Sequence, residues 1–510
     1  MRAHAPGGPR LSTTRLHTCW VRTVHVAHGR LAGMAAWVGI ALYLLDLSLK
    51  LIALGVVPRN RRPSSGMAWL LLILALPIFG WVIFLVLGRT KLGRRRFEQQ
   101  AEVNAIVAER TANVPTLEAG FPGPAYVQSV ATLNRNLGAQ PAMPGNRVDL
   151  FSVYRESVAA MTAEIDKATT WVHVEFYITA WDDVTGPFYE ALVRAVERGV
   201  TVRLLFDHLG SRGIPGYKEF TARLDTTGIE WHPMLPIAPF KRRPDLRNHR
   251  KILVIDGVVA FAGSLNLIEP GYNKPKNHEL GREWVELVAR VEGPVVSALN
   301  LLFATDWYSE TEIKLTEEIG TAPPPAGEIE GQVIPSGPGF ATENNLRAFT
   351  TLLYSAQHRL SITSPYFVPD ESLLYAITTA AQRGVEVELF VSEAGDQFMV
   401  YHAQRSYYEA LLRAGVRIYM YPAPAILHSK FFSVDDDVAV IGSSNMDMRS
   451  FGLNYEVSLM VLGPEVVAEV RKVENTYRAM AKELLLEDWL GRSRGSAYWD
   501  NVMRLTAALQ

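Results

Sequence analysis

Six chemically distinctive positions recur in this chain with the same internal spacing. Residues 249–266 and residues 428–445 both read H-x-K-x4-D followed by G-S-x-N, and the glycine stands 14 positions after the histidine in each copy. The intervening residues are largely different, so the shared spacing indicates an internal duplication rather than coincidence. We therefore expect the chain to fold as two copies of one unit, with the two motifs in equivalent places.

The segments around the two motifs follow the same order. In each half a strand pattern precedes a segment of helical period, which precedes a second apolar strand. These segments are 171–178, 187–198 and 199–207 in the first half and 360–368, 371–383 and 384–391 in the second half. A proline-rich linker at 320–331 separates them. The sequence predicts an α/β fold with two domains, 145–319 and 332–510, related by a pseudo-twofold axis.

Two apolar segments precede the duplicated region. The segment 34–57 has two charged residues, Asp46 and Lys50, which are four positions apart and can pair on one helical face. The segment 67–87 has no charge, and its 21 residues reach about 30 Å as a helix, the thickness of a bilayer core. Neither segment has the polar face of a buried core helix. We expect a hairpin of two transmembrane helices within residues 34–90.

The regions on either side of the hairpin set its expected orientation. Residues 1–33 are basic and read as an irregular tail rather than a secretory signal, because no small-residue cleavage site follows. Residues 91–144 read as a connector with one short helix. The flanks carry more arginine and lysine than the nine-residue loop at 58–66, so the positive-inside rule places both ends of the hairpin in the cytoplasm.

Composition excludes several functional classes. The formal net charge is -1, which argues against a protein that binds nucleic acid through a basic surface. Cys19 is the only cysteine, so neither an internal disulfide nor a cysteine-rich metal site is possible. Function is therefore expected from histidine, lysine, asparagine, serine and carboxylate side chains.

Strand geometry explains the spacing inside each motif. Residues two positions apart on a strand share a face, so His249 and Lys251 are expected to point to the same side. Asp256 and Gly257 supply a hairpin turn, and the returning strand brings the G-S-x-N segment back towards the histidine. The same holds for the second motif, with Asp435 in the turn. Both aspartates are candidate catalytic residues as members of the motif, although their position favours a role in the turn.

The residue types of the motif suit chemistry at a phosphodiester. A neutral histidine can attack phosphorus, lysine and asparagine can donate to the phosphate oxygens, and a second histidine can protonate the leaving oxygen. A single H-x-K would more often be part of a surface strand. Two complete copies facing each other across one phosphate provide both histidines, so the pair predicts an active site. A metal is not expected, because the lysines would repel a cation.

The duplicated motif resembles that of the phospholipase D superfamily. Within it, the apolar hairpin followed by 92–96 (LGRRR), together with 363–370 (TSPYFVPD) and 447–451 (DMRSF), is similar to bacterial cardiolipin synthases. Two departures stand out. The first G-S-L-N replaces the Gly-Gly-Met-Asn that is usual in these synthases, and Trp-Val-Glu at 284–286 stands where Trp-Arg-Asp is common.

The resemblance implies a fold and roles for the motif residues. Each domain would be an α/β/α sandwich with a mixed sheet flanked by helices. His249 would attack the phosphate to form a phosphohistidine, and His428 would act as the general acid and then as the general base. The remaining implied roles are phosphate binding by Lys251, Lys430, Asn266 and Asn445, support of phosphate binding by Ser264 and Ser443, and orientation of the histidines by Glu286 and Glu456.

The function implied is that of a membrane-bound phosphatidyltransferase that joins two phosphatidylglycerol molecules into cardiolipin and releases glycerol, without metal or cofactor. A hydrolytic phospholipase D is the nearest alternative. A phosphodiesterase acting on nucleic acid and an inactive membrane scaffold are further alternatives, opposed respectively by the neutral charge and by the completeness of both motifs. Residues 235–243 (LPIAPFKRR) are expected to contact lipid or to form a solvated loop. The oligomeric state stays open.

Overall fold

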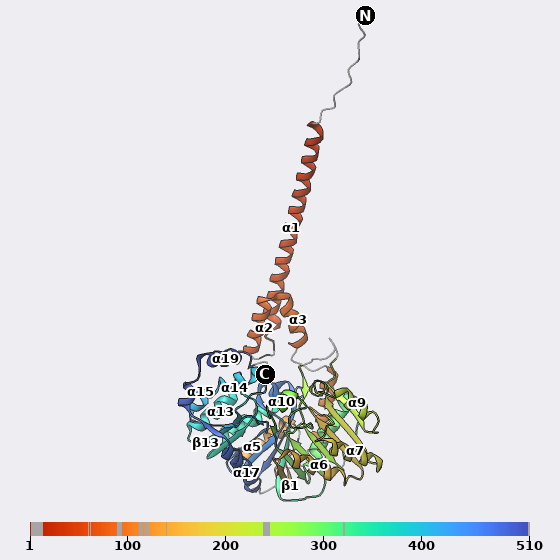
Figure 1. Cartoon of the computed structure of the whole chain (residues 1–510), viewed down its shortest axis with the longest axis vertical. Helices are drawn as coiled ribbons and strands as arrows, with labels where there is room; N and C mark the ends of the chain where they lie inside the picture. The colour runs from red at the N-terminus through yellow and green to blue at the C-terminus, as the bar shows by residue number, and fades with distance from the viewer. Residues whose placement is uncertain are drawn as a thin grey trace. The chain divides into compact units, whose positions relative to one another are not determined.

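The chain folds into two units, Met1–Thr90 and Lys91–Gln510, in a computed structural model (Figure 1). The structure describes residues 1, 14–59, 61, 63–88, 94–111, 116–117, 121, 123–138, 140–237, 245–319 and 322–507. Most of the stretch 235–243, which we expected to contact lipid or to form a loop, lies outside these residues, as do residues 320 and 321 of the expected linker.

The first unit begins with a long helix. Helix α1 (Thr14–Val56) starts within the segment that we expected to be an irregular tail. Among the described residues, its part from Ala36 to Val56 is the one helix long and apolar enough to cross a membrane. The expected pairing of its two charged residues is confirmed, because Lys50 Nζ lies 2.7 Å from Asp46 Oδ2.

The second apolar segment is not the continuous helix that we expected. It is divided into α2 (Pro63–Ala75) and α3 (Pro77–Leu87), with Leu76 in a non-helical conformation between them. Pro77 explains the break, since proline lacks an N–H group and disfavours the helical conformation of the residue before it. A Cβ atom at Gly80 would lie 2.8 Å from the Cα of Ile73, so the two helices pack with their backbones in contact.

The second unit begins with two helices where we expected one. Helices α4 (Arg94–Arg110) and α5 (Ala125–Gly138) both precede the first strand. Helix α5 buries one apolar face, whereas α4 begins with three arginines and is mostly polar. The connector therefore contributes packed helices to the second unit.

The first half contains the following elements in chain order. They are β1 (Met143–Phe151), α6 (Tyr154–Ile165), β2 (Trp171–Phe176), α7 (Gly186–Glu197), β3 (Thr201–Asp207), α8 (His208–Arg212), α9 (Tyr217–Leu224), β4 (Glu230–Met234), β5 (Arg247–Asn248), β6 (Ile252–Ile255), β7 (Val259–Gly263), α10 (Pro275–Glu279), β8 (Trp284–Val285), β9 (Val288–Glu292) and α11 (Val296–Thr311). The predicted strand, helix and strand after residue 170 are present, as is the hairpin formed by β6 and β7.

The second half repeats this order and then adds a C-terminal extension. Its elements are β10 (Ile329–Ser336), α12 (Asn344–Ser355), β11 (Arg359–Thr363), β12 (Phe367–Val368), α13 (Glu371–Gln382), β13 (Glu386–Ser392), α14 (Phe398–Arg405), α15 (Tyr408–Ala414), β14 (Arg417–Tyr421), β15 (Ile426–Leu427), β16 (Phe431–Val434), β17 (Val438–Gly442), β18 (Met446–Asp447), α16 (Met448–Gly452), β19 (Asn454–Leu462), α17 (Pro464–Met480), β20 (Lys482–Leu484), α18 (Leu486–Leu490) and α19 (Arg494–Arg504). Strand β10 begins inside the segment expected to be a linker.

The two halves share one mixed sheet. Its strand order is β20-β14-β13-β11-β16-β17-β19-β10-β1-β9-β7-β6-β2-β3-β4, and β5 pairs with β19. The antiparallel pairing of β1 with β10 joins the halves, and the order of equivalent strands runs outward from this seam in both directions. The sheet therefore has the pseudo-twofold arrangement that the duplicated sequence predicted.

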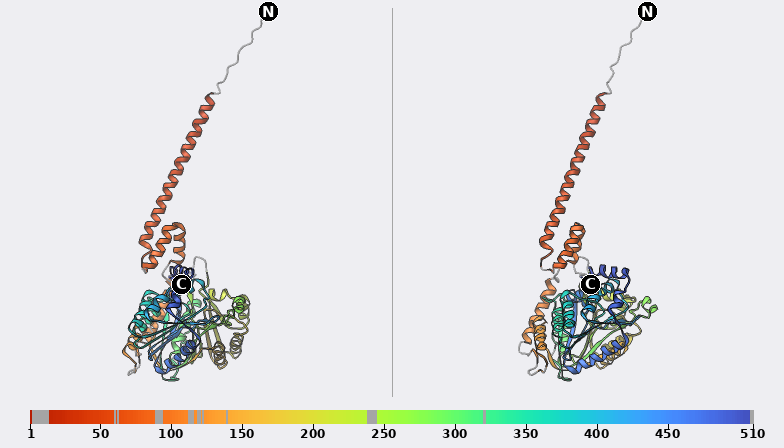
Figure 2. Two further views of the ribbon diagram at one scale, coloured as in Figure 1. Left: turned by 60° about the vertical axis from the view of Figure 1, so that its left-hand side comes forward. Right: turned by 90° about the vertical axis from the view of Figure 1, so that its left-hand side faces the viewer.

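Helices cover both faces of the sheet (Figure 2). Alternate residues of β6 show the two layers: Ile252 and Val254 pack into a core with α11 and α17, whereas Leu253 and Ile255 pack into a core with α6 and α7. In the second half, α12 and α13 cover the face that corresponds to that of α6 and α7. Apolar residues on both sides of a strand explain why the central strands read as continuous apolar runs.

Candidate active site

The two motif histidines lie where the halves exchange short strands. His249 follows β5, which pairs in parallel with β19 of the second half, and its backbone N–H donates to Tyr455 O at 2.9 Å. His428 follows β15, which pairs in parallel with β8 of the first half, and its N–H donates to Val285 O at 2.8 Å. Each histidine is thus held beside a strand of the opposite half.

This exchange pairs each histidine with a glutamate of the other half. His249 Nδ1 lies 3.0 Å from both carboxylate oxygens of Glu456, and His428 Nδ1 lies 2.7 Å from Glu286 Oε1. His249 Nδ1 also lies 3.1 Å from the carbonyl oxygen of Ser443, which can only accept a hydrogen bond. The proton therefore stands on Nδ1, and Nε2 of the neutral ring is left as the nucleophilic or proton-accepting atom.

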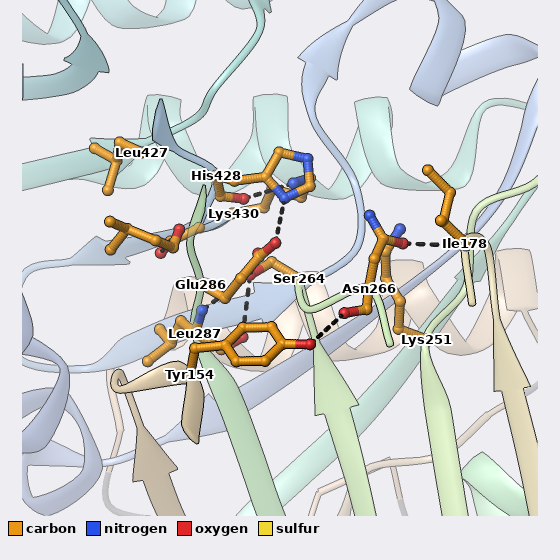
Figure 3. A network of polar contacts seen from close by, with 12 residues as sticks. Tyr154, Ile178, Lys251, Ser264, Asn266, Glu286, Leu287, Leu427, His428 and Lys430 are labelled. Carbon is orange, nitrogen blue, oxygen red and sulfur yellow. Dashed lines mark hydrogen bonds and ion pairs between the residues drawn. The ribbon is translucent and has the colours of Figure 1, made fainter. Parts of the chain in front are cut away.

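The motif serines contact the glutamates. Ser264 Oγ donates to Glu286 Oε2 at 2.6 Å and accepts from Leu287 N at 2.9 Å (Figure 3). In the second half Ser443 donates to Glu456 Oε2 and accepts from Val457 N in the same way. The support of the phosphate that we expected from the serines stays a prediction, and the contacts observed are with the carboxylates that pair with the histidines.

The glycine before each serine has a steric cause. A Cβ atom at Gly263 would lie 2.3 Å from Leu287 O, and one at Gly442 would lie 2.3 Å from Val457 O. Both values are far inside van der Waals contact, so only glycine allows the strand to approach the glutamate strand this closely. In each motif the glycine allows the close approach of the strands, and the serine contacts the glutamate, Glu286 or Glu456.

The lysines and asparagines complete the polar set. Lys251 Nζ donates to His249 O at 2.7 Å, and Lys430 Nζ donates to His428 O at 2.6 Å, which leaves other N–H groups of each ammonium for a phosphate. Asn266 Nδ2 donates to Tyr272 OH at 2.8 Å. Its Oδ1 accepts from Ile178 N at 3.3 Å (Figure 3). The amide orientation of Asn266 is thereby fixed.

Two tyrosines flank the histidines, and sequence reasoning missed their role. The ring of Tyr177 packs edge-on against His249 at 4.7 Å between centroids, and Tyr366 packs against His428 at 6.3 Å. Both tyrosines come shortly after the first parallel strand of their half, β2 or β11. Their equivalent places in the duplication were the signal that could have identified them.

Burial and neighbouring cations favour neutral histidines. Burial lowers the pKa of His249 well below its usual value, and the charges of Lys251, Lys430 and His428 lower it further. Burial also lowers the pKa of His428, although the charge of Glu286 opposes this effect. The pKa of Lys430 falls to about 8 because of burial, and burial lowers that of Lys251 well below its usual value.

The pKa values of the two glutamates are shifted in opposite directions. Burial tends to raise the pKa of Glu286, but the charge and hydrogen bond of His428 outweigh it and the pKa is lowered. Burial raises the pKa of Glu456 to about 7 against the opposing charge of Lys251. Glu286 is therefore ionised at neutral pH and stabilises a protonated His428 more strongly than Glu456 stabilises a protonated His249.

The motif aspartates lie apart from this set. Asp256 accepts hydrogen bonds from the backbone N–H groups of residues 169–171, at the start of β2, and Asp435 accepts from those of residues 357–359, at the start of β11. Seven residues of extended chain separate each aspartate from its histidine, roughly 20 Å. These contacts agree with a role for Asp256 and Asp435 in the turns, and a catalytic role for them stays a prediction.

The remaining groups form a site for displacement at phosphorus. Two histidines from opposite halves each present Nε2, and two ammonium groups lie near enough for their charges to act on both rings. One histidine can attack while the other protonates the leaving oxygen, and the cations stabilise the developing negative charge. The pseudo-twofold arrangement therefore provides both partners of an in-line displacement.

Comparisons with known proteins agree with this geometry. The family model described as "Cardiolipin synthase, PLD-like domain" matches residues 161–307 and 349–476, which include both motifs and both glutamates. A second model, "Phospholipase_D-nuclease N-terminal", matches residues 49–89. Among solved structures, phosphatidylserine synthase of Haemophilus influenzae Rd KW20 superposes with a TM-score of 0.56 over 74% of this chain and 97% of that chain, at 16% identity.

Curated relatives are similar over most of their length. The chain is 34% identical to Cardiolipin synthase A of Proteus mirabilis (strain HI4320) over 447 residues, which cover 84% of this chain and 90% of that protein. It is 34% identical to Cardiolipin synthase A of Yersinia pseudotuberculosis serotype IB (strain PB1/+) over 455 residues, 86% of this chain and 91% of that protein. With both motifs and the exchanged glutamates in place, the chain belongs to the phospholipase D-like cardiolipin synthase family.

Proposed function

We propose that the chain transfers the phosphatidyl group of one phosphatidylglycerol to the glycerol hydroxyl of another, giving cardiolipin and free glycerol. The observation that carries the proposal is the reciprocal pairing of His249 with Glu456 and of His428 with Glu286. It yields one two-histidine centre, and the relatives of the chain are named cardiolipin synthases. Both substrates are phospholipids, in agreement with a chain that has an apolar N-terminal helix.

In the first step Nε2 of His249 attacks phosphorus, and the bond from phosphorus to the glycerol oxygen breaks. His428 donates its Nε2 proton to that oxygen, so glycerol leaves as a neutral alcohol and the phosphatidyl group stays on His249. Lys251 and Lys430 donate to the non-bridging oxygens, together with the amide groups of the two motif asparagines. Glu456 stabilises the positive charge that forms on His249.

In the second step the neutral His428 removes a proton from a glycerol hydroxyl of the second phosphatidylglycerol. The hydroxyl oxygen attacks phosphorus, the bond from phosphorus to His249 breaks, and both histidines return to their starting states. Water in place of this hydroxyl would give phosphatidic acid. The site favours the lipid acceptor because His249 and His428 are almost completely buried, which limits the access of bulk water.

The division of roles follows from the charges of the glutamates. A general acid must be protonated before the first step, and the pKa of His428 is lowered less than that of His249 because the charge of Glu286 opposes the effect of burial. A nucleophile must be neutral, and the low pKa of His249 supports that state. Geometry alone is nearly symmetric, so the unequal charges of Glu286 and Glu456 are what distinguishes the two histidines.

The proposed location is the cell membrane, with the catalytic unit in the cytoplasm. Arginines on both flanks of the apolar region support this orientation through the positive-inside rule. Two crossings, by α1 and by the α2–α3 segment, would place both chain ends in the cytoplasm. Reporter fusions at the two ends test this arrangement, because a re-entrant α2–α3 pair beside one crossing helix would place the ends on opposite sides.

Purified chain incubated with labelled phosphatidylglycerol, without nucleotide or metal, tests the proposed reaction. We expect cardiolipin and an equal amount of released glycerol, whereas a His428→Ala variant should form no cardiolipin and show no repeated turnover. Phosphatidic acid as the main product would replace the proposal by hydrolysis. Absence of turnover on phosphatidylglycerol would reject it as the donor.

A further inference from the structure

The C-terminal helix α19 is attached to the second half partly through a buried charge. Its acidic residue, Asp500, is fully buried and accepts from His402 Nδ1 at 2.7 Å and Arg405 Nε at 3.2 Å, both on α14. Arg405 also donates to Ser496 Oγ at 2.9 Å. A surface helix normally buries apolar residues and exposes charged ones. Helix α19 does bury part of Met503 against the core, but it is also held by the buried carboxylate of Asp500.

The other face of α19 exposes apolar and aromatic side chains. Tyr498 is 63% exposed, Trp499 47% and Leu505, which follows the helix, 85%. On α14, Phe398 and Met399 are 58% and 43% exposed. We call these five residues the aromatic edge. The rings of Phe398 and Trp499 meet edge-on at 5.9 Å, and Figure 1 shows α14 and α19 close to one another in the second unit. The rings of Tyr498 and Trp499 are also in contact, so three of the five side chains form one aromatic cluster across the two helices.

The exposed charges of α19 itself are positive. The exposed charged residues of α19 are Arg494 and Arg504, at its two ends, and its carboxylate is the buried Asp500. Tryptophan and tyrosine favour the boundary between lipid headgroups and hydrocarbon, and arginine near this boundary attracts anionic lipid. An exposed apolar face between two cations matches a helix that lies in the plane of a membrane surface.

The aromatic edge continues into the active site. Tyr366, which flanks His428, donates from its hydroxyl to Asp396 Oδ2 at 2.6 Å and accepts from Gln397 Nε2 at 2.9 Å. Phe398, the first residue of α14, follows Gln397 directly. A lipid headgroup at the aromatic edge would therefore lie near Tyr366, the residue that packs against His428.

We propose that the aromatic edge docks on an anionic phospholipid surface and seats the catalytic unit there with the His428 side of the site against the lipid. This docking is additional to the N-terminal apolar helix, and it does not require that the reaction be the one proposed above. The helix α1 keeps the protein at the membrane, whereas the aromatic edge sets the orientation of the catalytic unit on it.

Site-specific labelling of the full chain tests the docking without relying on turnover. In a Cys19→Ser background, a Tyr498→Cys variant is labelled with an environment-sensitive fluorophore and reconstituted into vesicles that contain phosphatidylglycerol. The matched control is Tyr354→Cys, because Tyr354 is also exposed and lies at the end of α12 that leads to the start of β11, away from the histidines.

We expect emission from position 498 to shift to shorter wavelength and to be quenched by spin-labelled lipid, at least about threefold more than emission from position 354. The shift should weaken in zwitterionic vesicles and at high salt. Equal quenching at the two positions would overturn the proposal. Protection of position 498 in detergent without lipid, with crosslinking between two copies, would overturn it in favour of self-association.

A double variant, Phe398→Ser with Trp499→Ser, gives a second measurement. We expect turnover on phosphatidylglycerol in vesicles to fall about tenfold or more, because two interfacial side chains are lost. Turnover on short-chain phosphatidylglycerol in detergent should change less than twofold. An equal loss on both substrates would contradict docking, and unchanged thermal unfolding of the variant shows that it is folded.

Discussion

Glu286 accepts a hydrogen bond from His428 Nδ1 at 2.7 Å although the two residues are 142 positions apart and belong to opposite halves. Ser264 holds the same carboxylate from the other side, so the first half supplies a complete support for the histidine of the second half. In the same way, Ser443 and Glu456 of the second half hold His249 of the first half. Neither half therefore contains an oriented histidine of its own.

Replacing Glu286 by glutamine tests whether the negative charge of its carboxylate, rather than its size and shape, is needed for activity. The amide is nearly isosteric but cannot stabilise a protonated His428, so we expect kcat to fall by roughly 10²-fold to 10⁴-fold. The loss should be larger than for Glu456→Gln, because the pKa of Glu286 is lowered whereas that of Glu456 is raised to about 7, which leaves Glu456 only partly ionised at neutral pH. Steady-state kinetics of both variants give the comparison, and equal losses would contradict the unequal roles.

The identity of the nucleophile can be read from a trapped intermediate. In a His428→Ala variant, the acid and base are missing but His249 remains, so slow attack should leave a labelled phosphatidyl group on His249. A His249→Ala variant should show no adduct. Mass spectrometry of the quenched protein locates the label, and an adduct on His428 in the second variant would reverse the assignment.

Lys430 should set the alkaline limit of activity. Its ammonium group binds phosphate only when protonated, and burial lowers its pKa to about 8. The charge is therefore present below pH 8 and lost as the pH rises through it, so kcat/KM should fall with a midpoint near pH 8. In Lys430→Arg, whose side chain stays charged, the decline with a midpoint near pH 8 should disappear, and any decline that remains should come from Lys251, whose pKa is also lowered. A profile flat to pH 10 in the unsubstituted chain would contradict the assignment.

The motif aspartates should affect stability rather than chemistry. Asp256 accepts hydrogen bonds from three backbone N–H groups and two hydroxyls of residues 169–171. Asp256→Ala should lower the free energy of unfolding by roughly 2–4 kcal/mol, because several donors lose a charged partner. Turnover per folded molecule should change less than twofold. Thermal unfolding and active-site titration check both parts, with the exposed Asp183→Ala as control; a loss of turnover without a loss of stability would favour a chemical role.

Local patterns in the sequence were sufficient to predict the strands, the hairpins and the duplication. Apolar runs and the Asp256-Gly257 turn are short-range signals, and β6 and β7 formed as they predicted. Pro77 was also a local signal, but its effect on Leu76 outweighed the apolar length of the segment and divided the helix. The break at Leu76 can therefore be predicted from the proline alone, whatever the length of the apolar segment.

The exchange of glutamates could not be predicted from local patterns. Its partners are up to 207 residues apart, and the pairing depends on which half each short strand joins. The contacts of the motif serines were hidden for the same reason, since Ser264 contacts a carboxylate that reaches His428 only after the halves combine. The burial of Asp500 likewise depends on a distant contact, that of α19 with α14.

The reciprocal insertion of β5 and β15 also bears on synthesis of the chain. The first histidine leaves the ribosome 207 residues before the glutamate that orients it, a delay of roughly 10–40 s at ordinary translation rates. During that time the nascent protein has a nucleophile without its partner or its acid. A truncated or half-made polypeptide should therefore be unable to consume membrane lipid, and catalytic competence appears only when the last strands of the sheet are in place.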